Sequence, residues 1–179
     1  MKRMRLLNCI LMVMVVGLGS NVFAGTESQF DKKAYAKIAK KTIGRVISNN
    51  IDVDKMSADM EKLVALGVSG CKEYMGNPET PPAEVKVMKI TIENADKMKS
   101  LTLDQIETQW HEGGVLKANG VDIGKFDHFD EVMCFVDTVV HPATAIICLK
   151  EYRKTKNAEL LQQIQDELAE VVEHLKHLK

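Results

Sequence analysis

Residues 161–178 read LQQIQDELAEVVEHLKHL, and their apolar side chains recur at alternating intervals of three and four residues. This is the spacing of a heptad seam, in which one face of an α-helix packs against a partner helix. The segment therefore predicts a packed helix near the C-terminus of the chain. The apolar positions of this seam are Leu161, Ile164, Leu168, Val171, Leu175 and Leu178.

Helical periodicity continues upstream of the seam. It predicts helices over about 29–48, 54–71 and 127–154, and Thr155-Lys156-Asn157 predicts a tight turn with Asn157 capping the last helix. Short turns join antiparallel neighbours. We therefore expect an all-α fold, an antiparallel helical bundle of four or more principal helices.

Residues 85–92 fit two patterns. Apolar residues spaced for a helix overlap with the alternation of Met88, Ile90 and Ile92, which fits a strand. We favour a helix that has Pro82 in its first turn, because the neighbouring segments are helical.

The region between the third and fourth predicted helices is less regular. Thr102 to Gln105 reads as a capping box that starts a short helix through Trp110. Four glycines then predict a loop of roughly a dozen residues, which is long for a simple connection. They are Gly113, Gly114, Gly120 and Gly124.

The N-terminus has the pattern of a cleaved export signal. A basic start is followed by an apolar run over residues 6–16 and by Val22-Phe23-Ala24, which resembles a signal-peptidase site. The run is shorter than the ~20 residues of a membrane-spanning helix. We expect residues 1–24 to be a signal peptide, residues 25–179 to form one helical domain with no membrane span, and the mature protein to be periplasmic.

Charge and cysteine content narrow the function classes. The signal removes three basic residues and no acidic ones, so the net charge changes from −1 to −4, which argues against nucleic acid as a partner. Cys71, Cys134 and Cys148 remain, without the C-x-x-C-H of covalent haem. We expect no Cys134–Cys148 disulfide, because Pro142 between them should kink the helix rather than reverse the chain.

Histidines next to acidic residues suggest a ligand site. Trp110 and His111 stand before the glycine loop, and His128, Asp137 and His141 follow it. One interpretation is a pocket lined by His128, Asp137 and His141 and closed by Trp110 and the loop. The alternative is a solvated helix face opposite an apolar core face.

The C-terminal segment offers a second set of donors. Glu170 and Glu173 each precede a histidine, His174 and His177, by four residues, so each pair can meet on the helix surface. Two histidines and two carboxylates are suitable ligands for a transition metal. However, the segment lacks the Glu-x-x-His pairing of di-iron bundles.

These patterns lead to two functional hypotheses. We prefer an exported, non-enzymatic helical protein that binds a small molecule or a partner protein, because no nucleophile–base pair emerges from the sequence. The alternative is a metal- or haem-binding bundle with a redox or storage role. Neither the cofactor nor the oligomeric state follows from these residues.

Overall fold

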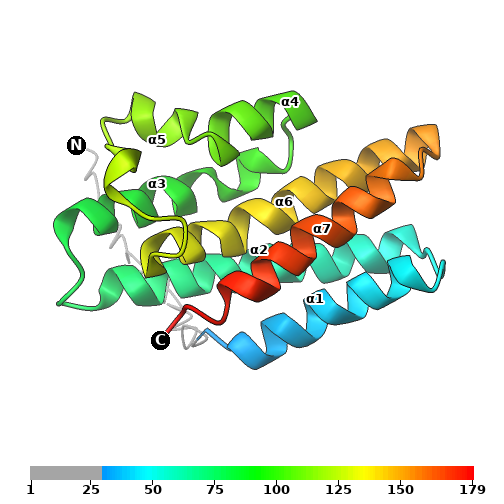
Figure 1. Ribbon diagram of the computed structural model, residues 1–179, viewed down its shortest axis with the longest axis horizontal. Coiled ribbons are helices and arrows are strands. Elements are labelled where there is room, and N and C mark those ends of the chain that lie inside the picture. Colours follow the sequence, from blue (N-terminus) through cyan, green and yellow to red (C-terminus); the bar gives the residue numbers. More distant parts are fainter. Residues whose placement is uncertain (1–29) are drawn as a thin grey trace, which may run out of the picture.

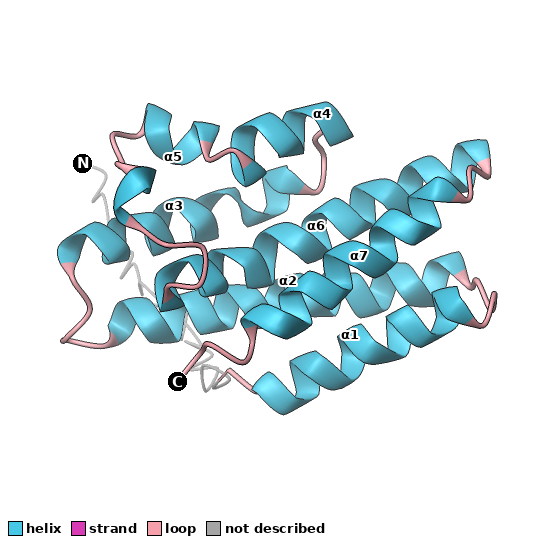
Figure 2. Cartoon of the chain, in the orientation of Figure 1, coloured by secondary structure: helices cyan, strands magenta, loops and turns pink. Residues whose placement is uncertain are grey.

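The computed structural model describes residues 30–179, and within this range it contains helices and loops but no strand (Figure 2). The predicted signal peptide, residues 1–24, lies outside the described residues. The all-α prediction is confirmed, and residues 85–92 lie in a helix. The principal helices are α1 (Lys32–Ile47), α2 (Val53–Gly76), α3 (Pro82–Met98), α6 (Glu131–Thr155) and α7 (Glu159–His174).

Four of these helices form the bundle. α1, α2, α6 and α7 pack in a closed ring of neighbours, α1 on α2, α2 on α6, α6 on α7 and α7 on α1. Short connections make sequential partners antiparallel, and α3 packs against α2 and α6 as a fifth long helix (Figure 1). The short elements α4 (Leu103–Ile106) and α5 (Gly114–Ala118) lie on the side of α3 and α6 away from α1 (Figure 1).

The predicted seam is confirmed as the packed face of α7. α7 packs against α6 and α1, and all six seam residues are buried, but α7 ends at His174, so Leu175 and Leu178 continue the buried face beyond the helix. The preceding turn differs slightly from the expectation. α7 begins at Glu159, and the Asn157 side chain accepts a hydrogen bond from the Glu159 backbone N–H at 3.0 Å.

The central helix of the fold is α6. Its length and composition would allow it to cross a membrane, contrary to our expectation that no such segment follows the signal. However, 89% of its apolar window is buried inside the protein, so its position among α2, α3 and α7 accounts for the same apolarity.

Pro142 lies inside α6 without interrupting it. Proline cannot donate the hydrogen bond that would satisfy the carbonyl of Thr138, four residues earlier. The hydroxyl of Tyr35 on α1 donates to this carbonyl instead, at 2.7 Å. Gly67 on α2 allows the close approach, because a Cβ there would lie 2.4 Å from the same oxygen.

The continuous α6 also settles the cysteine geometry. Fourteen residues of one helix separate Cys134 from Cys148, about 21 Å along its axis. Both thiols, and that of Cys71, are free and buried. The expectation of no disulfide between Cys134 and Cys148 is therefore confirmed.

The glycine-rich region is more ordered than predicted. The capping box at Thr102 is present, but α4 passes into a π-helical turn, η1 (Glu107–His111). The predicted dozen-residue loop contains α5 and a 3-10 turn, η2 (Ile123–Lys125). Gly113 and Gly120 have φ of +71° and +70°, which explains glycine at the two ends of α5. Elements of three to five residues are too short to produce a readable apolar period.

Candidate functional site

The polar faces of α6 and α7 meet inside the fold and form a histidine–carboxylate cluster. α6 supplies a carboxylate and a histidine one turn apart, and α7 supplies three residues on one face, beside its apolar seam. Two further histidines come from the segment that precedes α6. The seven residues of the cluster are His111, His128, Asp137, His141, Glu167, Glu170 and His174.

His174 is the most deeply buried member of the cluster, with 1% of its side chain exposed. Its Nδ1 lies 3.1 Å from Asp137 Oδ2, and its Nε2 lies 3.9 Å from Glu170 Oε1. Neither contact has hydrogen-bond geometry, so both ring nitrogens are buried without a hydrogen-bond partner. Such atoms need an explanation in a folded protein, and a bound ion is one.

His141 connects the two long helices. Its Nδ1 is hydrogen-bonded to Glu167 Oε2 at 2.7 Å, and its Nε2 lies 4.0 Å from Asp137 Oδ1. Its ring centroid is 5.3 Å from that of His111 and 5.8 Å from that of His174. His141 is thus in the middle of the row of rings, with carboxylates on both sides.

The π-helical turn places His111 over this row. The Glu112 N–H reaches back five residues to the Glu107 carbonyl, at 2.9 Å. Such a π-helical turn holds one residue more than a turn of α-helix, which changes the direction of the side chains that follow. Turns of this kind are frequent at functional sites. His111 Nε2 consequently lies 3.0 Å from Thr144 Oγ1 on α6 and 3.8 Å from Glu167 Oε2.

His128 and Glu170 form the solvent-facing edge of the cluster. Their side chains are 58% and 50% exposed, whereas the other five are mostly buried. His128 Nε2 lies 3.7 Å from Glu170 Oε1, and its ring meets that of His174 edge-on at a centroid distance of 4.5 Å.

Burial alters the proton affinity of several members. Burial is the largest cause that raises the pKa of Asp137 to about 6, against the opposing effect of His141. Burial, and then the nearby His141 and His128, lower the pKa of His174 to about 4. Burial also lowers the pKa of His111. Two imidazoles are therefore neutral at pH 7, the form that ligates metals.

His141 behaves in the opposite way. Burial opposes its protonation, but the hydrogen bond with Glu167 and the charge of Asp137 outweigh it, so the pKa of His141 is raised. The cluster thus holds three acidic side chains around its imidazoles. Two of these imidazoles, His111 and His174, favour the neutral form. A divalent cation would offset this half-buried negative charge.

The two predicted sets of site residues are grouped differently in the structure. The structure brings His111, His128, Asp137 and His141 together as anticipated, and adds Glu170 and His174 from the second predicted set. The solvated-face interpretation of α6 is wrong at His141, which is 3% exposed.

Three predicted residues lie apart from the cluster. Trp110 is 5% exposed and belongs to the hydrophobic core. His177 stacks on the half-exposed Phe129, and Glu173 pairs with Lys176. The predicted quartet of Glu170, Glu173, His174 and His177 is therefore not a single site, because Glu173 and His177 lie outside the cluster that contains Glu170 and His174.

Glu167 is the member that sequence reasoning missed. The spacing that indicates a pair is an acid four residues before a histidine, and Glu167 has no such partner on its own helix. Its spacing of three and seven residues from Glu170 and His174, beside the apolar seam, was the available signal.

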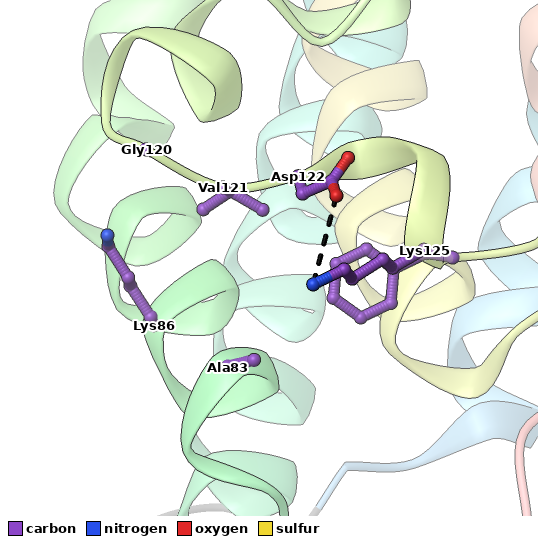
Figure 3. Close-up of a pocket in the computed structure, with 7 residues that line it drawn as sticks. Ala83, Lys86, Gly120, Val121, Asp122 and Lys125 are labelled. Carbon is purple, nitrogen blue, oxygen red and sulfur yellow. Dashed lines mark ion pairs between the residues drawn. The ribbon is translucent and has the colours of Figure 1, made fainter.

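The glycine-rich segment also lines a separate pocket. Gly120 and the following residues face the first turns of α3, and Lys125 pairs with Asp122 at 3.8 Å (Figure 3). Its volume of about 170 Å³ is below the ~300 Å³ at which ligand pockets begin. None of the predicted site residues lines it. This part of the segment packs on α3 rather than closing over the histidines.

Comparison with known proteins identifies no relative: no family model, curated protein or solved structure matches this chain. The functional argument therefore depends on the geometry of the cluster.

Proposed function

We propose that the protein binds a divalent first-row transition-metal ion in the histidine–carboxylate cluster. The observation that carries the proposal is His174, an imidazole whose two nitrogens are buried without hydrogen-bond partners among carboxylates. Leaving such a group unsatisfied costs about 1–3 kcal/mol. A metal ion accepts the imidazole lone pair and removes much of this cost.

The donor types favour one class of metal. Imidazole suits zinc, iron, nickel and copper, and carboxylates suit manganese as well. No thiolate belongs to any of the three ligand groups found among the described residues. These donors support a transition metal rather than calcium or magnesium, which prefer oxygen ligands alone.

The preference for an organic ligand has less support. Neither the small pocket at Gly120 nor a larger one of about 620 Å³ beside Lys179 is lined by any of the residues expected to bind it, and Trp110 is part of the core. The metal-binding alternative derived from the sequence is thus the better-supported function. Its seven ligand residues replace the four that the sequence suggested, and only Glu170 and His174 belong to both sets.

The proposal is tested with Co²⁺ on the full mature chain after EDTA treatment and dialysis. We expect visible absorption bands from Co²⁺ in a protein site and loss of these bands on addition of Zn²⁺. The variant His174→Ala should weaken Co²⁺ binding by at least about 10- to 100-fold.

The matched control is His177→Ala, three residues beyond the end of the same helix, whose ring stacks on Phe129 outside the cluster. It should bind like the wild type, and circular dichroism checks that both variants are helical. Wild-type affinity in a folded His174→Ala, or wild-type protein that binds no Co²⁺, would contradict the proposal.

A further inference from the structure

The cluster contains more donors than one ion needs. Protein metal sites of the zinc type use three or four protein ligands, and here seven side chains converge. They fall into two groups that share no residue. The inner group is His111, His141 and Glu167, and the outer group is His128, Asp137 and His174.

In each group, the three ligand atoms lie within 4.8 Å of one another. A third set with the same property joins the groups through Glu170, together with His141 and His174. Glu170 Oε1 lies 3.7 Å from His128 Nε2 and 3.9 Å from His174 Nε2. A carboxylate between two sets of three ligands is placed to bridge two ions, which are ~3.5–4 Å apart in dinuclear sites.

The two groups differ in their access to solvent. The inner group lies behind the π-helical turn, where His111 and Glu167 are 20% and 13% exposed. The outer group opens to solvent at His128 beside Glu170, both at least half exposed. At a five- or six-coordinate ion, three protein ligands and a bridge leave a position free for water or a small anion.

We propose that the cluster is dinuclear: an inner ion held by His111, His141 and Glu167, and an outer ion held by His128, Asp137 and His174, with Glu170 between them. The outer ion exchanges a small anionic ligand with solvent. This inference rests on the proposed metal binding and adds the number of ions, their ligands and the ligand class of the open position.

The first test counts ions. The EDTA-treated protein is saturated with Co²⁺, passed through a desalting column and analysed for metal and protein. Two Co²⁺ per chain are expected for the wild type and for His177→Ala. One Co²⁺ is expected for His128→Ala and for His111→Ala.

The second test assigns the open position, with azide as the small anion. Azide should change the visible Co²⁺ spectrum of the wild type and of His111→Ala, which retains the outer ion. The apparent azide affinity of His128→Ala should be at least tenfold weaker. His128 is exposed, so its removal should not prevent folding; His128→Asn provides a second variant.

The outcomes separate this inference from the proposed function. No bound Co²⁺ in the wild type would overturn both. One Co²⁺ per wild-type chain would leave metal binding intact and overturn the dinuclear site. Two ions with an unchanged azide response in His128→Ala would overturn the assignment of the open position to the outer ion.

Discussion

His174 occupies a position at which an apolar residue would suit the fold better. It follows the seam residue Val171 by one turn, is fully buried, and has no hydrogen bond in return for its lost hydration. A buried polar group without partners destabilises a protein. If metal binding is the role of His174, replacing it with an apolar residue should raise the stability of the metal-free protein and weaken metal binding.

We therefore predict that His174→Leu is more stable than the wild type without metal. Leucine removes the unsatisfied imidazole, so the free energy of unfolding in EDTA should rise by about 1–3 kcal/mol. The inner ion should stabilise both proteins, whereas the outer ion should add ~4 kcal/mol to the wild type alone at a thousandfold excess of Zn²⁺ over its Kd, and reverse the order. Urea unfolding in EDTA and in Zn²⁺ measures both values. A less stable His174→Leu in EDTA would show that the imidazole is already well accommodated.

The carbonyl of Thr138 gives a second prediction. Tyr35→Phe removes its hydrogen-bond donor but keeps the ring packing, so unfolding should become easier by about 1–3 kcal/mol. In the background Pro142→Ala, the backbone N–H of residue 142 can donate to the same carbonyl, and the cost of Tyr35→Phe should fall by about 1 kcal/mol. Urea denaturation of the four proteins measures the coupling. Equal costs in both backgrounds would mean that the Tyr35 hydroxyl does not act through the carbonyl that Pro142 leaves without its helical donor.

The pKa values predict how pH affects metal binding. The pKa of Asp137 is raised to about 6 and that of His141 is raised by Glu167 and Asp137, so both hold protons in mildly acidic solution. A metal ion must displace these protons, and affinity falls as pH decreases. His174, with a pKa lowered to about 4, is already neutral and adds little above pH 5.

We expect Zn²⁺ affinity to be at least about tenfold weaker at pH 5.5 than at pH 7, with a flatter dependence above pH 7. Calorimetry in two buffers of different ionisation enthalpy should show more proton release at pH 6 than at pH 7.5. His177→Ala should follow the same profile. An affinity independent of pH would exclude Asp137 and His141 as ligands.

At the scale of elements, the sequence predicts long helices better than the segment between them. Each long helix has several turns in which apolar spacing repeats, and the seam of α7 predicts its packed face residue by residue. The turn η1 has no such repeat, and its last residue, His111, contacts Thr144 on α6. The sequence therefore could not indicate that His111 would reach Thr144.

The cluster was only partly predictable for a related reason. Periodicity assigns a polar face to each helix but does not show that two polar faces meet. The face of α6 with Asp137 and His141 reads as solvated until α7 is placed against it. Glu167 gains its role only across that interface, through a contact with His141 twenty-six residues away.

The segment between α3 and α6 is attached to the cluster at two points. His111 and His128 flank residues 112–127. His111 lies near the carboxylate of Glu167 on α7, and His128 lies near that of Glu170 on the same helix. Ions bound to both histidines would hold the two ends of this segment to the bundle. We predict that Zn²⁺ slows amide hydrogen exchange within 112–127 by about tenfold or more, relative to the EDTA-treated protein.

Mass-spectrometric hydrogen exchange measures this protection. In His128→Ala, the protection near residue 127 should be lost while that near His111 persists. His177→Ala serves as the unaffected control. Equal exchange with and without Zn²⁺ in the wild type would show that the segment is ordered independently of the metal.

In the whole molecule, different side chains hold the bundle together and form the cluster. The ring of α1, α2, α6 and α7 is closed by apolar residues and by Tyr35, while the cluster lies between α6, α7 and the added segment. If the cluster binds metal as proposed, the apolar bundle can fold before the ion arrives. A protein that folds first and acquires its metal afterwards can take it from the compartment to which it is delivered.

The N-terminal segment predicts that this compartment is the periplasm. The basic residues Lys2, Arg3 and Arg5, the apolar run over 6–16 and the site at Val22-Phe23-Ala24 predict export and cleavage. Expressed at full length in a Gram-negative host, the protein should appear in the periplasmic fraction with Gly25 as its first residue. Val13→Arg places a charge inside the apolar run and should leave an uncleaved protein in the cytoplasm, because the run must stay apolar to be recognised. Fractionation with N-terminal sequencing measures both proteins, and a wild-type protein recovered with its N-terminus intact in the cytoplasm would refute export while leaving the metal proposal to be judged by Co²⁺ binding.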